Sequence, residues 1–244
     1  MDFQELVKFR KSSRVPYKIK PIPRDDLKKI LIAAQMTPTP HNTQPFEIII
    51  VEDREIIKKI SEVKFRLNKE FIDEHFFWTR YSYEELREKK DGVHVNSLPS
   101  FVLDLKKNHE LIDDDKFWDK AGELYSLYIQ ASSLLLFVIY NRNRKGCGPL
   151  KHLWGIISIG AVMENIWLAA NDLGISVQLV SGQLADPEAA TKLKQILKIS
   201  DKNYQLMLFF RFGYERNFFK KEEKFRRDLK DFVHVNYFGN KFTE

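Results

Sequence analysis

The stretch G-I-I-S-I-G-A-V-M-E-N-I-W-L-A-A-N-D-L-G, residues 155–174, decides the fold. Apolar residues recur at helical spacing along one face, at Ile156, Ile159, Met163, Ile166, Trp167 and Ala170. The opposite side is also apolar, with Ile157, Val162 and Leu168. A helix that is apolar nearly all round must be buried on both sides. We therefore expect a helix over 155–173, capped by Gly174, in the middle of a domain or at a subunit interface.

Short strands and helices flank this helix in both directions along the chain. Clusters of β-branched and aromatic residues predict strands at 46–51, 134–140, 176–180 and 204–214. Helical spacing predicts helices at 54–67, 116–129 and 186–197. It also predicts an opening helix that ends in the basic run 10–14, and a second that starts at Arg24 or Asp25 and stops before the prolines at 38 and 40. With no repeat and no linker, residues 1–244 are expected to form one domain.

Two regions do not follow this regular pattern. Residues from about 68 to 115 are rich in aromatic and charged residues, with a turn at Asp91-Gly92. They are interpreted as a lid or an arm across a partner subunit, or as a variable surface insertion. The segment from about 218 to 244 is basic and aromatic, and it has little means of forming its own core. We expect this extension to wrap over another surface.

Composition limits the class of protein. The 244 residues are 43% hydrophobic and 30% charged, as in an ordinary soluble domain. The net charge of +6 attracts anions, but acids are interspersed among the bases of 220–231, so a nucleic-acid partner is not favoured. The longest apolar stretch is broken by Glu164 and Asp172, and no signal peptide is expected at the start, so no membrane partner is predicted. The lone Cys147 forms no internal disulfide, which suits a cytoplasmic location.

Several common kinds of chemistry lack their motifs. The six histidines are scattered without ligand spacing, so no metal site is expected. There is no G-x-S-x-G elbow and no Walker A loop. Gly146-Cys147-Gly148 lacks the third glycine and the following helix of a dinucleotide fingerprint, and it is interpreted as a turn.

Three separated stretches remain as candidates for ligand binding. R-K-S-S-R at 10–14 offers forked donors and hydroxyls to a phosphate, although a surface basic cluster is the commoner meaning. T-P-T-P-H-N-T-Q-P-F at 37–46 is a rigid polar loop that suits a ligand edge or a structural turn. L-V-S-G-Q at 179–183 leaves backbone N–H groups at a strand end beside any flat ligand.

Taken in this order, the stretches resemble the FMN-dependent nitroreductase family. Its R-x-S-x-[RK] signature matches Arg10, Ser12 and Arg14. Its P-S-x-x-N-x-Q-P-W signature is matched, with Thr for Ser and Phe for Trp, by Pro38, Thr39, Asn42, Gln44, Pro45 and Phe46. Its G-x-x-x-N-x-x-L-A-A-x-x-x-G helix is matched by Gly160, Asn165, Leu168, Ala169, Ala170 and Gly174. An F-G-Y strand end at 212–214 precedes the pair Lys224 and Arg226. The resemblance covers 1–60 and 150–235 well and 68–130 poorly.

The resemblance implies an α+β fold, with a central, mostly antiparallel sheet flanked by helices, in an interwoven homodimer. It implies that the FMN phosphate and ribityl chain contact a basic set: Arg10, Ser12, Lys224 and Arg226, with Lys11 nearby. Arg14 would approach the pyrimidine edge of the flavin ring. The ring would be lined from the partner subunit by Pro38, Thr39, Pro40, Asn42 and Gln44. Its N5 side would lie along Leu179, Val180, Ser181 and Gly182, although the family commonly has an acid where Ser181 stands.

The implied activity is transfer of a hydride from NAD(P)H through FMN to a small electron-poor acceptor, such as a nitroaromatic or a quinone, in a ping-pong reaction. No catalytic acid or base is assigned. Relatives on the fold include reductive dehalogenases and enzymes that break down FMN. The lid residues Tyr81, Tyr83, Glu84, Glu85 and Lys89 suggest the former without aligning to it. A flavin-binding protein without turnover is a further alternative.

Overall fold

The computed structural model describes residues 1–93, 98–218 and 223–243, apart from the side chains of 75–79. Contacts divide the chain into two compact units. Unit 1 consists of Met1–Arg66 and Trp118–Lys220, and unit 2 of Leu67–Phe117 and Lys221–Glu244. The segments expected as a lid (68–115) and as an extension (218–244) both include residues outside the described ranges.

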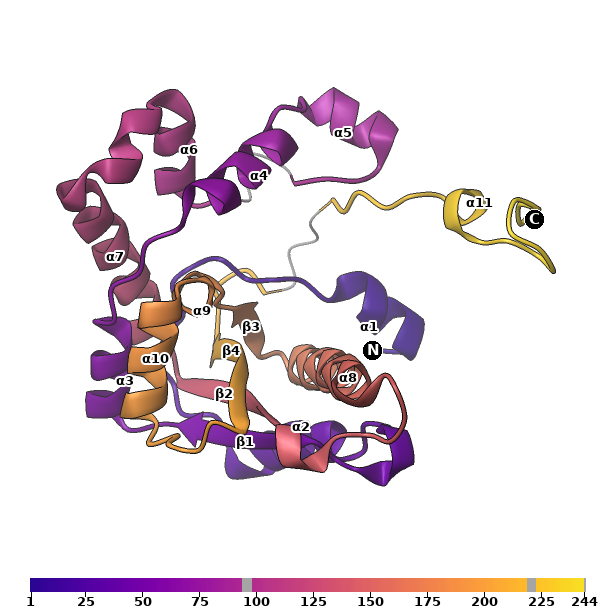
Figure 1. Cartoon of the computed structure of the whole chain (residues 1–244), viewed down its shortest axis with the longest axis horizontal. Helices are drawn as coiled ribbons and strands as arrows, with labels where there is room; N and C mark the ends of the chain where they lie inside the picture. Colours follow the sequence, from indigo (N-terminus) through magenta and orange to yellow (C-terminus); the bar gives the residue numbers. More distant parts are fainter. Residues whose placement is uncertain (94–97, 219–222, 244) are drawn as a thin grey trace. The chain divides into compact units, whose positions relative to one another are not determined.

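Unit 1 is built on a four-stranded sheet in the order β1-β2-β4-β3. Its strands are β1 (Phe46–Val51), β2 (Leu134–Asn141), β3 (Ser176–Leu179) and β4 (Tyr204–Gly213). All neighbouring pairs are antiparallel, with a bulge in the β2–β4 ladder between Val138 and Ile139. Helices lie on either side of the strands (Figure 1). The expected α+β class with an antiparallel sheet is therefore confirmed.

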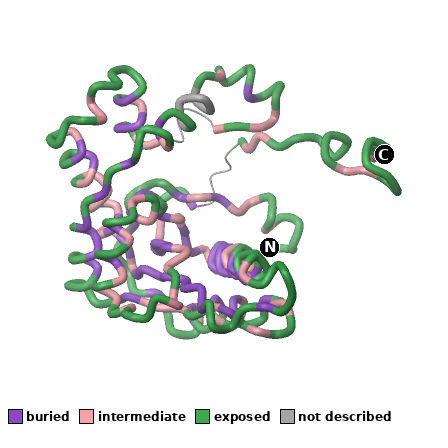
Figure 2. The backbone as a smooth tube through the Cα atoms, viewed as in Figure 1, coloured by how far each residue is buried: buried purple, intermediate pink, exposed green. Residues whose placement is uncertain are grey.

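The main core lies between one face of this sheet and two helices, α2 (Arg24–Gln35) and α8 (Lys151–Asp172). The even-numbered residues of β2, from Leu134 to Tyr140, point into it. Burial is concentrated in the strands and along α8 (Figure 2). The Asn165 amide of α8 donates to the Ala33 carbonyl and to Thr37 Oγ1, which ties α8 to the end of α2. The sheet forms one layer, and α2 and α8 form a second layer packed against it.

Helix α8 begins four residues before the expected Gly155, and its N-terminal half is not buried all round within the chain. Trp154, Ile156 and Ile157 are 39%, 44% and 51% exposed. By length and composition alone α8 could cross a bilayer. Most of its apolar residues are covered by α2 and the sheet, so a bilayer is not needed to explain them. The exposed N-terminal half of α8 agrees with the second of the two places expected for this helix, a subunit interface.

The other face of the sheet is covered by a second group of elements. They are α3 (Arg54–Ser61), α7 (Asp115–Gln130), α9 (Gly182–Ala185) and α10 (Pro187–Ile196). On this face Phe137 stacks on Phe209 at 4.4 Å between ring centroids. The expected helix over 54–67 is wrong at its end, because α3 stops at Ser61. The Gln183 side-chain amide donates hydrogen bonds to the carbonyls of Ile60 and Val63. If the helix continued past Ser61, the Ile60 carbonyl would instead accept a hydrogen bond from the next helical turn.

Unit 2 contains short helices and irregular chain. Its elements are α4 (Lys69–Thr79), α5 (Tyr83–Lys89), α6 (Ser100–Lys107), a 3-10 helix (His109–Asp113) and α11 (Leu229–Phe232). A capping box between Ser82 and Glu85 starts α5. Lys90 pairs with Asp228 at 2.6 Å, which joins α5 to the C-terminal segment inside this unit.

Candidate functional site

Residues 10–14 follow α1 (Phe3–Phe9), which Asp2 caps at its start. From Arg10 to Arg14 burial alternates residue by residue. Lys11 and Ser13 are buried, Arg10 and Ser12 are half-buried, and Arg14 is exposed. The backbone N–H of Ser13 donates to the Val177 carbonyl of β3 at 2.9 Å, which holds the segment against the sheet edge. The structure therefore brings the first and third expected stretches together.

The inward side chains of this segment share one carboxylate. Lys11 Nζ lies 2.8 Å from Glu215 Oε1, and Ser13 Oγ donates to Glu215 Oε2 at 2.6 Å. The side chains of Lys11 and Glu215 are only 6% and 7% exposed. The ammonium group of Lys11, expected near a phosphate, is thus neutralised inside the protein. Its contribution is to anchor the segment.

The outward side chains are placed differently. Arg10 Nε lies 3.3 Å from Glu164 Oε1, and its guanidinium lies 5.0 Å from the centroid of the Trp167 ring. The Trp167 indole in turn donates to the Lys11 carbonyl at 2.9 Å. Helix α8 therefore orients Arg10 through two neighbouring side chains, one of which is an acid that a bound anion would displace.

The loop expected as a ligand edge is rigid through its own hydrogen bonds. It contains the 3-10 helix η1 (Pro40–Asn42), and His41, Asn42 and Gln44 all have positive φ angles between 44° and 55°. The Gln44 backbone N–H donates to Thr39 Oγ1, and its side-chain amide donates to Asn42 Oδ1, both at 3.0 Å. Pro38 is exposed on the same loop. Asn165 joins this loop to α8, which also contacts Arg10.

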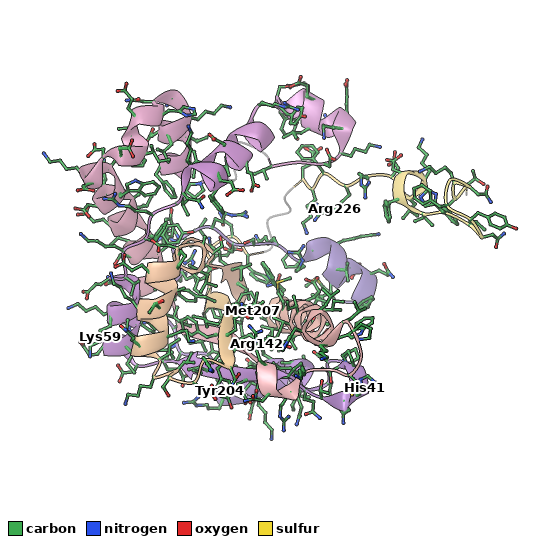
Figure 3. The ribbon with its side chains drawn as sticks, viewed as in Figure 1. His41, Lys59, Arg142, Tyr204, Met207 and Arg226 are labelled. Carbon is green, nitrogen blue, oxygen red and sulfur yellow. The ribbon has the colours of Figure 1, made fainter. Side chains whose placement is uncertain are left out.

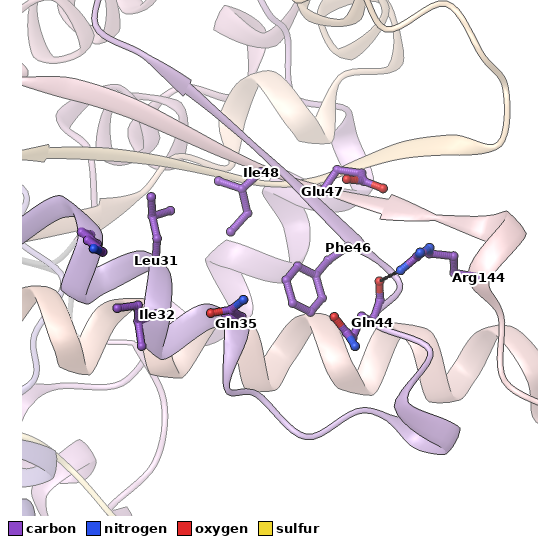
Figure 4. Close-up of a pocket in the computed structure, with 9 residues that line it drawn as sticks. Leu31, Ile32, Gln35, Gln44, Phe46, Glu47, Ile48 and Arg144 are labelled. Carbon is purple, nitrogen blue, oxygen red and sulfur yellow. Dashed lines mark hydrogen bonds between the residues drawn. The ribbon is translucent and has the colours of Figure 1, made fainter. Parts of the chain in front are cut away.

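A cleft of about 490 Å³ opens between α2 and β1 beside this loop. Gln44 lines it together with Phe46 and Ile48 of β1 and Leu31 of α2 (Figure 4). Arg144, from the 3-10 helix η4 (Arg142–Arg144), donates to the Gln44 carbonyl at its rim. The cleft beside the polar loop is therefore lined by both apolar and polar side chains, the latter including Lys28, Gln35 and Glu47.

The third stretch ends β3 and begins α9. The backbone N–H of Val180 donates to the Phe209 carbonyl at 2.7 Å, whereas Ser181 is exposed and Leu179 half-buried. A Cβ atom on Gly182 would lie 2.9 Å from the Phe65 ring, so only glycine fits there. Burial raises the pKa of Tyr125, and a hydrogen bond from the Gly182 backbone works against that rise.

Lys224 and Arg226 belong to unit 2, on a stretch without helix or strand (Figure 3). Lys224 is half-buried and Arg226 exposed. Between them Phe225 packs edge-on against Tyr83 of α5, at 5.4 Å between centroids. These two cations therefore belong to a different unit from Arg10, Ser12 and Arg14.

Sequence reasoning missed two residues that hold the segment 10–14 in place, Arg211 and Glu215. Arg211 of β4 is 0% exposed and binds the carbonyls of Ser13 and Val15, on either side of Arg14. Its signal was a single charge in the apolar run M-L-F-F-R-F-G at 207–213. Glu215 lies just after this strand. The sequence gives no sign of its role, because its partners Lys11 and Ser13 lie about 200 residues away.

Solved structures of other proteins share the fold of this chain. A structure of the FMN- and NADPH-dependent nitroreductase NfnB from Sphigopyxis sp. strain HMH is 16% identical, with a TM-score of 0.62 over 98% of this chain and 100% of that chain. A structure of an FMN-dependent nitroreductase from Clostridium difficile R20291 is 18% identical, with a TM-score of 0.57 over 96% of this chain and 98% of that one. These likenesses show a common fold.

A curated protein of Archaeoglobus fulgidus, provisionally named NADH dehydrogenase/NAD(P)H nitroreductase, is 43% identical over 58 residues. That match spans 24% of this chain and 33% of the relative. The profile of the nitroreductase family matches residues 7–214, which include both edges of the sheet and the stretches 10–14, 37–46 and 179–183. Because this match covers most of the chain, the protein belongs to the nitroreductase family.

Proposed function

We propose that the protein binds FMN and transfers a hydride from NAD(P)H to a small electron-poor acceptor, such as a nitroaromatic or a quinone, in a ping-pong reaction. The observation that carries this proposal is the alternation at residues 10–14. Lys11 and Ser13 are fixed inside by Glu215, so Arg10, Ser12 and Arg14 are presented on a rigid segment beside the end of β3. Two structural neighbours are named as FMN-dependent, which supports the choice of cofactor.

The donors of unit 1 fit the chemistry of FMN. The Arg10 guanidinium and the Ser12 hydroxyl suit a phosphate, with Lys11 as the anchor. Lys224 and Arg226, which belong to unit 2, are kept in the proposal as further cations for the phosphate. Arg14, exposed and cationic, suits the electron-rich pyrimidine edge of the ring. Leu179, Val180, Ser181 and Gly182 would lie along its N5 side, where the backbone turns from β3 into α9. When bound, FMN supplies the hydride chemistry, and the chain supplies orientation and charge.

A homodimer is part of this proposal. Besides Trp154, Ile156 and Ile157, Leu150 and Leu153 are 46% and 49% exposed at the N-terminal end of α8. Such a contiguous apolar surface on a folded unit is typical of a subunit interface. The rigid loop with Pro38, Thr39, Pro40, Asn42 and Gln44 would then line the flavin of the other subunit. Ile157→Glu is expected to shift the protein to monomer in sedimentation velocity, and a wild-type monomer at micromolar concentration contradicts this arrangement.

The dehalogenase alternative has less support from unit 2. Glu85 accepts a hydrogen bond from the Ser82 backbone in the capping box, which holds the pKa of its carboxyl below the ordinary value. Lys89 pairs with Asp91. Two of the five lid residues that suggest a dehalogenase therefore already have local partners. A lid function for 68–115 remains part of the proposal, as does a cytoplasmic location.

The test is an anaerobic titration of FMN-loaded protein with NADH and with NADPH, followed by visible absorbance. We expect one of them to bleach the flavin, and addition of a quinone or a nitroaromatic to restore its colour. A flavin that neither nicotinamide reduces contradicts the proposed reaction and favours a binding protein without turnover. Release of iodide when iodotyrosine is the acceptor would favour the dehalogenase alternative.

A further inference from the structure

Arg211 is a cation in the apolar interior of unit 1. It lies in β4 between Leu135 of β2 and Gln178 of β3 and is fully buried. Burial holds the pKa of its guanidinium below the ordinary value. Removing a charge from water costs several kcal/mol unless its hydrogen bonds are satisfied. The residue therefore requires an explanation beyond filling space, since a methionine would fill a similar volume without that cost.

The guanidinium donates four hydrogen bonds, from all three of its nitrogens, to uncharged acceptors. Nε donates to Gln178 Oε1 at 2.6 Å, and Nη1 donates to the Tyr128 carbonyl of α7 at 3.1 Å. Nη2 donates to the carbonyls of Ser13 at 3.3 Å and Val15 at 2.6 Å. A planar fork can reach Gln178, the Tyr128 carbonyl and the two carbonyls beside Arg14 at once, whereas a lysine ammonium is a point donor on a flexible stem.

A tyrosine completes this anchor. The Arg211 guanidinium lies 4.0 Å from the centroid of the Tyr17 ring, and the Tyr17 hydroxyl donates to the Ser13 carbonyl at 2.8 Å. Ser13 is held further by its side chain on Glu215 and its N–H on Val177. The backbone is thus fixed immediately before and immediately after Arg14, and Arg14 is the exposed residue between these two fixed points.

We propose that Arg211 is a positioning residue that fixes the Arg14 guanidinium at the pyrimidine edge of the flavin, and so sets how strongly the site prefers reduced over oxidised FMN. This inference depends on the proposed function. Reduced flavin carries negative charge near that edge, so a well-placed cation binds it more tightly than the oxidised form. A displaced Arg14 would lose part of that preference while the phosphate contacts of Arg10 and Ser12 persist.

The experiment compares FMN affinity and the midpoint potential of bound flavin in wild type, Arg211→Met and Arg211→Lys. The preference for reduced FMN is expected to fall at least tenfold in Arg211→Met, which lowers the midpoint potential by about 30 mV for a two-electron couple. Arg211→Lys keeps a charge but not the fork and is expected to lower the potential in the same direction. Ile57→Ala, in the buried face of α3, is the matched control. It is expected to lower the free energy of unfolding while leaving the potential unchanged.

A double-mutant cycle with Arg14→Ala separates positioning from a general structural role. In the Arg14→Ala background, Arg211→Met is expected to change the potential no further, because the cation that Arg211 places is gone. Should Arg211→Met not fold, Arg211→Lys and Tyr17→Phe carry the same test. Unchanged potentials in folded Arg211 variants, or additive effects in the cycle, overturn the proposal while the oxidoreductase function stands. A wild type that binds no FMN overturns both.

Discussion

Two basic stretches of the chain, residues 10–14 and 224–226, are both expected to meet the same phosphate, and they are built in opposite ways. In the first, every second residue is anchored in the interior by Glu215 or Arg211. In the second, the backbone is irregular, and the described anchor is the packing of Phe225 on Tyr83. The difference teaches that similar charge in a sequence can be preorganised in one place and adaptable in another, and preorganised donors lose less entropy on binding.

The largest effect is expected from breaking the anchor of the first stretch. Glu215→Ala leaves the buried Lys11 ammonium without its carboxylate, and loss of one partner of a buried ion pair costs about 3–5 kcal/mol. Urea unfolding measures this change. The double variant Lys11→Met, Glu215→Ala is the control and should recover part of the loss. A loss below about 1 kcal/mol for Glu215→Ala would show that the segment does not depend on this pair.

The next effect depends on pH. Burial raises the pKa of Tyr17 to about 12, and the nearby Arg211 only partly offsets that rise. The unfolded chain therefore releases this proton near pH 10 and the folded chain near pH 12. The stability that the neutral phenol provides is complete below pH 10 and is lost as the pH rises towards 12, by about 2–3 kcal/mol.

Tyr17→Phe isolates this contribution, because other titrating groups are common to both proteins. Between pH 9 and pH 12 the free energy of unfolding of wild type should fall about 2–3 kcal/mol further than that of the variant. Parallel pH curves for the two proteins would mean that the Tyr17 hydroxyl is not buried in the anchor.

The third effect concerns the ligand. Arg10→Ala should weaken FMN binding by about 2 kcal/mol, or about 30-fold, because the phosphate loses a charge-assisted donor. Glu164→Gln is the matched control, since it removes the acid that pairs with Arg10 and should leave the affinity equal or slightly higher. Fluorescence titration of the apoprotein measures both. Unaltered affinity in Arg10→Ala would remove this residue from the site.

The smallest effect is expected in the second stretch. Lys224→Ala and Arg226→Ala should each weaken FMN binding by less than about 1 kcal/mol, because both cations lie on chain without helix or strand and Arg226 is exposed. The same titration measures them beside Arg10→Ala. If either variant lost more affinity than Arg10→Ala, the proposed difference between residues 10–14 and residues 224–226 would be wrong.

Most of the fold of unit 1 could be predicted from the sequence, because it depends on local periodicity. The strand over 46–51 is confirmed to the residue, and the helix after Gly155 begins only four residues early. The end of α3 could not be predicted, because it depends on Gln183, more than 120 residues away. The exposure of the N-terminal half of α8 could not be predicted either, because composition shows that a helix is apolar but not which surface covers it.

The candidate site was predictable in part. The alternating signature Arg10, Ser12 and Arg14 marks residues that are half-buried or exposed, but their roles toward FMN remain predictions. The sequence could not show that Lys11 faces inward, because Glu215 lies far along the chain. Arg211 carried a visible signal, as a lone charge in an apolar strand, and its partners depend on the register of β4 with β3.

The measurement that tests the central claim most directly is a comparison of FMN with riboflavin in titrations of the wild-type apoprotein. The two ligands differ only in the phosphate, which the segment 10–14 is proposed to bind. We predict one FMN per chain and an affinity for FMN at least tenfold above that for riboflavin, reduced to within a few-fold in Arg10→Ala. Equal affinity of the wild type for the two ligands, or no binding of either, would contradict the account.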